Sequence, residues 1–293
     1  MHQTIPLSHH IEYRLLRLLE ALMRLIPRSM ALMLGALLGA VLYHLGVYRA
    51  IVKKNMDFVG LFEESKKRGI VKNLYRNTGR FFADFIRSSD NAPPYHVNNF
   101  QTAKSVFSRG KGSIIILAHF GNWEALASIF GMQLYDLNVL AKPMKNRLVE
   151  KWLFEKRLSA HVTPIYVSQA LRKMMTVLRR GGIIAMLIDQ YAGGQGSPSP
   201  FLGKNTSTVR TVAGLLHKTD CGIVFAYALL QKDGSYAVEI EEGPHLDVSR
   251  DDQEQFITAY QKAHNDVLSR WIAQHPDHYF GWFHRRFKDV ISY

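Results

Sequence analysis

The stretch HFGNWE contains two residues that could carry out acid–base chemistry, His119 and Glu124. His119 follows a continuous apolar run, which is typical of a strand buried on both faces. On one helix, five positions rotate through about 500°, so the two side chains would face apart. Here Gly121 and Asn122 predict a corner between a strand and a helix, and we expect this corner to fold the carboxylate back toward the imidazole. A histidine held by a carboxylate keeps one tautomer and gains basicity, as a general base for an alcohol requires.

The elements that would position these residues follow an alternating order. From residue 112 onward, short apolar strands alternate with amphipathic helices, which predicts an α/β layered sheet with flanking helices. The apolar runs 112–118 and 182–188 both end in polar residues, His119 in the first case and Asp189 and Gln190 in the second. Ligands on such sheets gather where strands end. The sequence therefore predicts a site formed at these strand ends.

The N-terminal part of the chain has a different pattern. Residues 8–28 form an amphipathic basic pattern, and no short apolar region leads to a signal-peptide cleavage site. The apolar run 30–47 has basic residues on both sides. As a helix of 18 residues it would be about 27 Å long, just short of the ~30 Å hydrocarbon core of a bilayer. We expect a membrane-anchoring segment that spans the bilayer or enters one leaflet. The alternative is a buried hairpin of core helices.

Residues 61–88 predict a further helix, with an aromatic stripe flanked by Lys and Arg. Such a helix suits the surface of an anionic bilayer, and equally suits docking on its own domain. The segment from Asn91 to Pro94 then interrupts the pattern. We therefore predict two parts: a helical membrane-associated region at 1–90 and a catalytic α/β domain at 91–293.

Composition limits the class of protein. The 293 residues are 47% hydrophobic and 21% charged, which excludes a disordered tail and a polytopic membrane protein. The net charge of +13 indicates an anionic partner, such as anionic lipid, a phosphorylated substrate, an acidic protein or nucleic acid. The single cysteine, Cys221, excludes an internal disulfide and a cysteine-rich zinc site. The spacing of the C-terminal histidines fits no common zinc site, and no nucleic-acid motif is present. We expect no metal and no cofactor.

HFGNWE resembles the His-x4-acid box of the glycerolipid acyltransferase superfamily. With Gly-Asn-Trp between its ends, it is similar to the box of the bacterial lipid A biosynthesis acyltransferases, the late lauroyl and myristoyl transferases. Further blocks resemble that family in the same order, over roughly residues 20–288, although Leu202 replaces the second phenylalanine of the family's Pro-Phe-Phe-Gly turn. The blocks are Lys142-Pro143 to Asn146 with Arg157 downstream, Asp189-Gln190, Pro200 to Gly203, and Tyr279 to Phe287.

The resemblance implies transfer of a fatty acyl group from acyl carrier protein to a hydroxyl of a lipid A precursor. His119 would take the hydroxyl proton, and Glu124 would hold the imidazole. The reaction needs no covalent enzyme intermediate, and acyl carrier protein is a substrate rather than a cofactor. The donor places the catalytic domain on the cytoplasmic face of the inner membrane.

Two kinds of anion would then need recognition. A compact lipid phosphate would need close contact with an arginine, and Arg157 is the candidate, although it could instead belong to a solvated basic face. The acidic carrier protein would need a broad, exposed field, such as Lys66, Lys67, Arg68, Arg179 and Arg180. Asp189 could cap a turn or position an arginine, and Arg285 and Arg286 could bind headgroups or pair with acids. The predicted substrate-binding residues are Asn122, Arg157, Asp189, Gln190, Arg285 and Arg286.

Three alternatives remain open. The same chemistry could act on another acceptor, such as a phosphatidylinositol mannoside, another glycolipid or an aminolipid. The charge would also suit a non-catalytic basic protein that binds nucleic acid at a membrane. The third alternative is a lipid-binding member without activity, against which the intact His119 and Glu124 argue.

Overall fold

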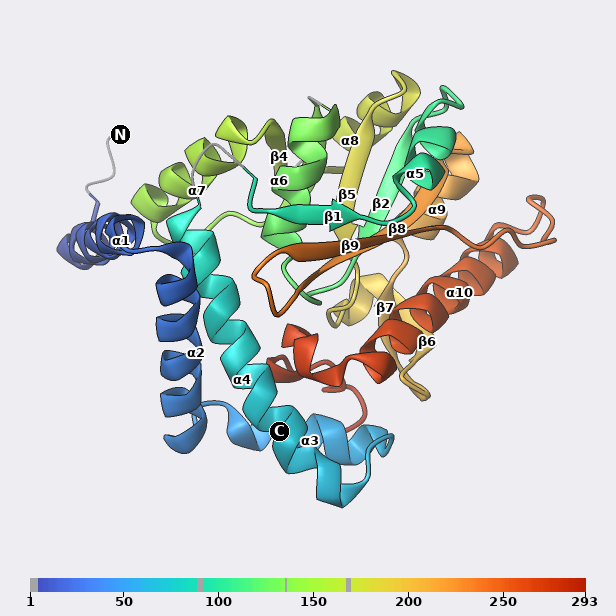
Figure 1. Ribbon diagram of the computed structural model, residues 1–293. Coiled ribbons are helices and arrows are strands. Elements are labelled where there is room, and N and C mark those ends of the chain that lie inside the picture. The colour runs from blue at the N-terminus through green and yellow to red at the C-terminus, as the bar shows by residue number, and fades with distance from the viewer. Residues whose placement is uncertain (1–4, 89–91, 135, 167–169) are drawn as a thin grey trace.

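The computed structural model describes residues 5–88, 92–134, 136–166 and 170–293, so the predicted boundary between residues 90 and 91 lies outside the described residues. Four helices come first, and strands then alternate with helices (Figure 1). The elements are α1 (Leu7–Leu25), α2 (Arg28–His44), α3 (Arg49–Val59), α4 (Glu64–Arg87), β1 (Tyr95–Val97), α5 (Phe100–Phe107), β2 (Ser113–Leu117), α6 (Trp123–Leu134), β3 (Leu137–Ala141), α7 (Arg147–Ser159), β4 (Val162–Tyr166), α8 (Ala170–Arg179), β5 (Ile183–Leu187), η2 (Gly193–Gln195), β6 (Gly196–Phe201), β7 (Lys204–Val209), α9 (Thr211–Thr219), β8 (Gly222–Leu230), β9 (Tyr236–Glu242), α10 (Gln253–Gln274), η3 (Pro276–His278) and η4 (Phe280–Phe283).

One sheet of seven strands forms the centre, in the order β1-β9-β8-β2-β5-β3-β4. The pairings are parallel except for the antiparallel pair β8 and β9. β6 and β7 form a separate antiparallel hairpin. The predicted α/β sheet is therefore confirmed, and it is mostly parallel.

Helices cover both faces of this sheet, and β2 shows why its sequence is a continuous apolar run. Ile114 and Ile116 pack on the side that holds the core residues of α8, α9 and α10. Ile115 and Leu117 pack on the other side, with core residues of α5 and α6. Because β2 and β5 are parallel neighbours with Leu117 opposite Leu187, the residues that follow each strand reach the same edge of the sheet.

The apolar N-terminal run is not one long helix. α2 ends at His44, and α3 begins at Arg49 after a turn in which Gly46 and Tyr48 have positive φ angles of 74° and 57°. The two helices meet at 82°. Within the described ranges, α2 and α3 satisfy the length and hydropathy of a membrane span only as this bent pair, and each helix alone falls short of them.

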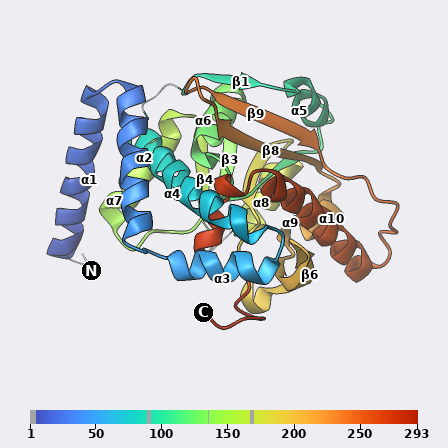
Figure 2. The same cartoon turned by 60° about the horizontal axis from the view of Figure 1, so that its bottom comes forward.

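α2 packs against α4 (Figure 2), and glycines lie where the two helices meet. A Cβ atom at Gly79 would lie 1.9 Å from the carbonyl oxygen of Gly35, and one at Gly39 would lie 2.0 Å from that of Tyr75. Such distances leave no room for a side chain. The glycines therefore set the close approach of the two helices.

We expect Gly79→Ala to lower the free energy of unfolding by about 1–3 kcal/mol, since an added methyl group must push the two backbones apart. Gly69→Ala in the same helix is the matched control. A Cβ there meets nothing within 4 Å, so alanine should stabilise the helix by about 0.5–1 kcal/mol. Denaturant unfolding of both variants measures the difference. Equal stabilities would mean that α2 and α4 do not pack as described.

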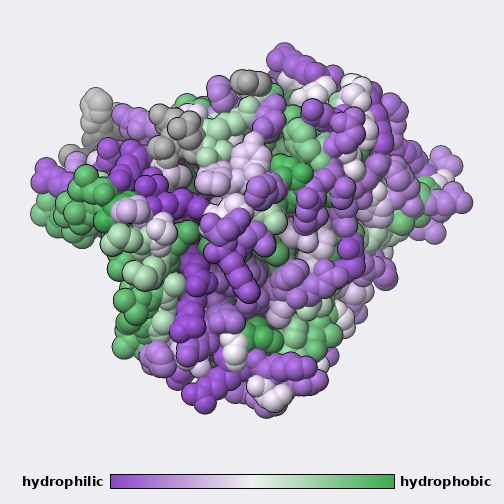
Figure 3. All heavy atoms as spheres, in the orientation of Figure 1, coloured by the Kyte–Doolittle hydropathy of each residue, from purple (hydrophilic) through white to green (hydrophobic). Residues whose placement is uncertain are grey.

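The outer surface of α1 and α2 is apolar, although it faces away from the core. Figure 3 shows this surface as a green region on the left of the molecule. The exposed fractions reach 75% for Leu7 and 81% for Leu25. The buried face of α1 is polar: Glu20 accepts a hydrogen bond from the Trp152 indole at 3.0 Å. α1 thus docks through polar contacts and leaves its leucines exposed, a large apolar patch of the kind that marks an interaction surface.

Candidate active site

His119 and Asp189 form a close pair at the carboxyl ends of β2 and β5. The Nδ1 atom of His119 lies 2.9 Å from Oδ1 of Asp189. Asp189 is buried, with 1% of its surface exposed, whereas the side chain of His119 keeps 17%. The carboxylate therefore lies beneath the imidazole and leaves Nε2 on the open side.

The contact raises the pKa of His119 and lowers that of Asp189, as expected for an ion pair. Burial pulls the pKa of His119 down, but the negative charge and hydrogen bond of Asp189, with the charge of Glu124, outweigh it and raise that pKa above 6.5. Burial pushes the pKa of Asp189 up, and the charge and hydrogen bond of His119 bring it below its usual value of 3.8. Asp189 is thus ionised at neutral pH and favours a proton on Nδ1 of His119.

Glu124 has a different partner from the one its position in HFGNWE suggested. Its two carboxylate oxygens accept hydrogen bonds from Nη2 and Nε of Arg157, at 2.6 and 3.3 Å. The carboxylate hydrogen-bonded to His119 is therefore Asp189, and the predicted contact from Glu124 is wrong. The reason is that Glu124 lies in the first turn of α6, where Arg157 of α7 reaches it. Its negative charge still acts on His119.

Arg157 lies next to the site, and two of its guanidinium nitrogens, Nε and Nη2, donate to Glu124. Both side chains are largely buried, with 19% and 13% exposed. A bidentate pair of this kind is geometrically specific and resists replacement by lysine. Binding of a lipid phosphate by Arg157 would have to use the N–H groups that Glu124 does not occupy, and stays a prediction.

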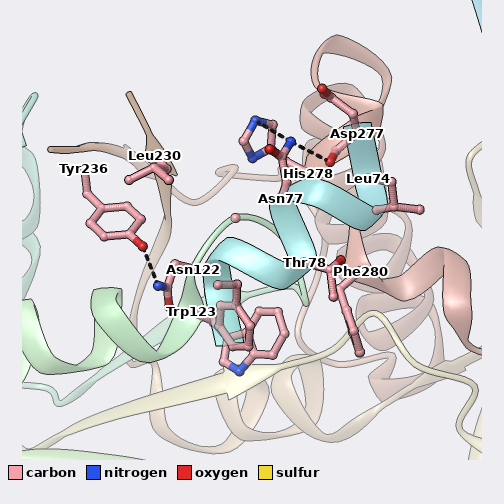
Figure 4. A pocket seen from close by; sticks show the side chains of 12 residues that line it. Leu74, Asn77, Thr78, Asn122, Trp123, Leu230, Tyr236, Asp277, His278 and Phe280 are labelled. Carbon is pink, nitrogen blue, oxygen red and sulfur yellow. Dashed lines mark hydrogen bonds between the residues drawn. The ribbon is translucent and has the colours of Figure 1, made fainter. Parts of the chain in front are cut away.

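Asn122 has a structural role at the corner. Its side-chain oxygen accepts from the backbone N–H of Ala125, which caps α6, and its amide donates to the hydroxyl of Tyr236 at 2.7 Å (Figure 4). Asn122 is buried, so we expect no direct contact with substrate. The backbone N–H groups of Gly121 and Asn122 donate to the carbonyls of His278 and Ala228, and are therefore not free to bind an oxyanion.

The C-terminal segment encloses the histidine. The backbone N–H of Phe280 donates to the carbonyl of His119 at 2.8 Å. Asn77 of α4 donates to the carbonyl of Asp277 and lies 3.4 Å from Nε2 of His278 (Figure 4). The segment from Asp277 to Phe280 is therefore fixed between α4 and the strand end that carries His119.

Two polar side chains lie on the open side of His119. The amide nitrogen of Gln190 is 3.4 Å from Nε2 of His119 and 3.2 Å from Nε2 of His284. Gln190 is exposed, and the ring centroids of His119 and His284 are 5.6 Å apart. Sequence reasoning missed His284 because it considered this histidine only as a zinc ligand. The sequence signal that could have identified it is its position between Phe283 and Arg285, inside the C-terminal block that resembles the family.

The two neighbouring arginines have opposite environments. Arg285 is exposed. Arg286 is 2% exposed, and it donates to the carbonyl of Ser207 and the hydroxyl of Thr208. The prediction that Arg286 binds substrate is therefore corrected: it ties the C-terminal segment to the β6-β7 hairpin from inside the protein.

The chain was compared with known families and proteins. A family model described as bacterial lipid A biosynthesis acyltransferase matches residues 3–289, nearly the whole chain. The chain belongs to this family. It is therefore an acyltransferase of the O-acyl type connected with lipid A biosynthesis. A search of curated proteins finds no match.

This acyltransferase has an apolar groove that ends beside His119. The groove has a volume of about 510 Å³ and is lined by side chains of α1, α2 and α4. At its inner end it meets Phe280, Phe283 and His284. The rings of Phe280 and His284 lie 6.5 and 5.6 Å from that of His119. Gly35, Gly39 and Gly79, which join α2 to α4, also line the groove.

Over the residues that the structure describes, no group of three or more His, Cys, Asp or Glu side chains could hold a metal ion. Cys221 is buried, and burial raises the pKa of its thiol to about 11. It is therefore a poor nucleophile at neutral pH.

Proposed function

We propose that this acyltransferase moves a fatty acyl chain from acyl carrier protein to a hydroxyl of a lipid A precursor, with His119 as general base. The observation that carries the proposal is the His119–Asp189 pair at the end of the apolar groove, with Nε2 on the open side. A base with a fixed tautomer beside an apolar channel suits an alcohol and a long acyl chain. The family supports the reaction class.

In this mechanism, Nε2 of His119 takes the proton of the acceptor hydroxyl while the hydroxyl oxygen attacks the carbonyl carbon of the thioester. The C–S bond then breaks, and the leaving sulfur takes the proton back from the imidazolium. The products are the acyl ester and the carrier thiol. Asp189 keeps the proton on Nδ1 and stabilises the imidazolium by its charge.

Glu124 and Arg157 would act one step away from the reacting atoms. The charge of Glu124 raises the pKa of His119 and so favours the imidazolium that forms during the reaction. Arg157 holds that carboxylate in place. Gln190 would meet the reacting groups directly, because its amide faces the open nitrogen of His119.

The groove is the proposed binding site for the acyl chain. Its lining is almost entirely apolar over α1, α2 and α4, and it ends at ring contacts with His119. Burying each methylene of a chain in such a groove contributes roughly 0.8 kcal/mol. The chain would thus hold its thioester end beside the imidazole.

The test is product analysis with purified protein and an acyl-loaded carrier protein. A lipid A precursor, a phosphatidylinositol mannoside and an aminolipid are offered in separate reactions. We expect an ester on the lipid A precursor only. Faster transfer to one of the other acceptors would assign the same chemistry to that lipid instead.

We further propose that the protein lies on the cytoplasmic face of the inner membrane, with the apolar surface of α1 and α2 entering one leaflet. The exposed leucines of α1 form a stripe along its outer side. Arg14 and Arg17 on the same helix would meet anionic headgroups. A leaflet-embedded surface also lets the acyl groove, which opens between these helices, lie close to the lipid.

We expect the protein to stay with membranes during a high-salt wash, because hydrophobic insertion is insensitive to screening. Replacing Leu15 and Leu22 by Asp should lower binding to vesicles at least about 10-fold, since each buried leucine contributes on the order of 1.5–3 kcal/mol. Leu171→Asp in α8, at an equally exposed leucine far along the chain, is the control and should have no effect. Release by salt alone would replace insertion with a purely electrostatic contact.

A further inference from the structure

The structure does not support the basic field that the sequence suggested for an acidic protein partner. Lys66 pairs with Glu63, and Lys67 pairs with Asp57 and Glu64. Arg179 and Arg180 lie just before Gly182, whose carbonyl accepts a hydrogen bond from Ser113, the first residue of β2. They are thus at the amino ends of β2 and β5, opposite the ends that carry His119 and Asp189.

Another group of cations surrounds the C-terminal segment, and we call it the C-terminal cationic surface. Lys204 lies over the ring of Phe58 at 5.3 Å, and Phe58 lies 5.2 Å from Phe287. Lys54 donates to the carbonyl of Ser292. The surface consists of Lys54, Lys204, Arg285 and Lys288.

This surface adjoins the open side of the candidate active site. Arg285 is exposed and directly follows His284, whose ring faces His119. Lys288 lies 4.5 Å from the ring centroid of Tyr191, the residue after Gln190. Arg285 is therefore next in the chain to His284, and Lys288 contacts the residue next to Gln190.

Positive charge predominates on this surface. Across the described parts of the chain, none of its four cations forms an ion pair with a carboxylate. The nearby Asp289 accepts hydrogen bonds from the hydroxyl of Thr206 and the backbone N–H of Ser207, and its single negative charge leaves an excess of positive charge on the surface. An unpaired cationic surface attracts an acidic partner and raises its rate of association.

We propose that the C-terminal cationic surface is where the acidic acyl carrier protein docks to deliver its thioester to His119. The inference rests on the proposed function, which supplies the carrier as donor. A membrane is the less suitable occupant, because the exposed leucines that would enter it are concentrated on α1 and α2. The carrier must also approach where Nε2 of His119 is open, and the cations flank that side.

The test compares two double charge reversals on the full-length protein. Arg285→Glu with Lys288→Glu changes the surface, and Arg179→Glu with Arg180→Glu makes the same charge change at the opposite end of the sheet. Binding of the acyl-loaded carrier is measured by calorimetry at several salt concentrations. We expect the first variant to bind at least 10-fold more weakly at low salt, with a flatter salt dependence. The control should stay within about twofold of wild type.

Binding to vesicles of anionic phospholipid is the second measurement, and we expect both double variants to match wild type. Loss of vesicle binding with unchanged carrier binding would assign the surface to the membrane and overturn the proposal. Equal weakening of carrier binding in both variants would mean that only the net charge of the protein matters, which also overturns the proposal. If the wild type transfers acyl groups from the carrier, the proposed function stands even when the docking surface is overturned. If the wild type neither binds nor uses the carrier, the proposed donor is wrong.

Discussion

We expect His119→Ala to lower the rate of acyl transfer at least about 10²-fold, since a positioned general base contributes roughly 10²–10⁴. The imidazole lies next to Phe280 and His284 of the groove and is held by the carboxylate of Asp189. Its removal leaves Asp189 buried below a space that substrate would fill. Steady-state kinetics with acyl-loaded carrier protein and the lipid A precursor measures the loss.

The control is His96→Ala, at an exposed histidine of the edge strand β1. It should keep wild-type turnover. Thermal unfolding of the His119 variant should show an intact fold, because the backbone contact from Phe280 uses the carbonyl of residue 119 and not its ring. A well-folded His119→Ala enzyme with near-normal turnover would contradict the role of His119 as general base.

The second large effect is expected from Asp189→Asn, at about 10²–10⁴-fold. An asparagine amide can donate to Nδ1 of His119, which moves the imidazole proton to Nε2 and prevents that atom from acting as a base. The shape of the side chain is nearly unchanged, so the loss reports the tautomer and the charge. Glu124→Gln is the comparison, and we expect it to cost less because Glu124 acts on His119 through its charge alone.

The pH profile separates a catalytic from a structural role for Asp189. His119 must be neutral to act as a base, so kcat/KM rises with pH through the pKa of His119. In the wild type that midpoint lies above 6.5, because Asp189 and Glu124 raise the pKa against the effect of burial. In Asp189→Asn the midpoint should move to lower pH while the plateau falls. A lower plateau with an unmoved midpoint would mean that Asp189 only supports the fold.

The place of the site could be predicted from the sequence, because it depends on a local pattern. Apolar runs that end in polar residues indicated that β2 and β5 carry His119 and Asp189 at one edge. The partner of His119 could not be predicted in the same way. Glu124 is five residues away in the chain, whereas Asp189 is 70 residues away, and only the parallel pairing of the two strands brings it to the ring.

The local sequence pattern also could not predict which arginine is buried or where the chain turns after α2. Arg285 and Arg286 are alike in sequence, yet one is exposed and the other fills a space behind the β6-β7 hairpin. The run 30–47 predicted one helix, but positive φ angles at Gly46 and Tyr48 end it early and turn the chain. The burial of Arg286 depends on contacts with Ser207 and Thr208, far away in the chain, which no local spacing can express.

The most direct test of lipid A acylation is mass spectrometry of the lipid A from cells that lack this protein. The proposal predicts a precursor that is lighter by one acyl chain, with the missing ester restored by the wild-type gene and not by the His119→Ala variant. Lipid A of unchanged mass in the deletion strain, with another lipid losing an acyl chain, would contradict the proposed acceptor.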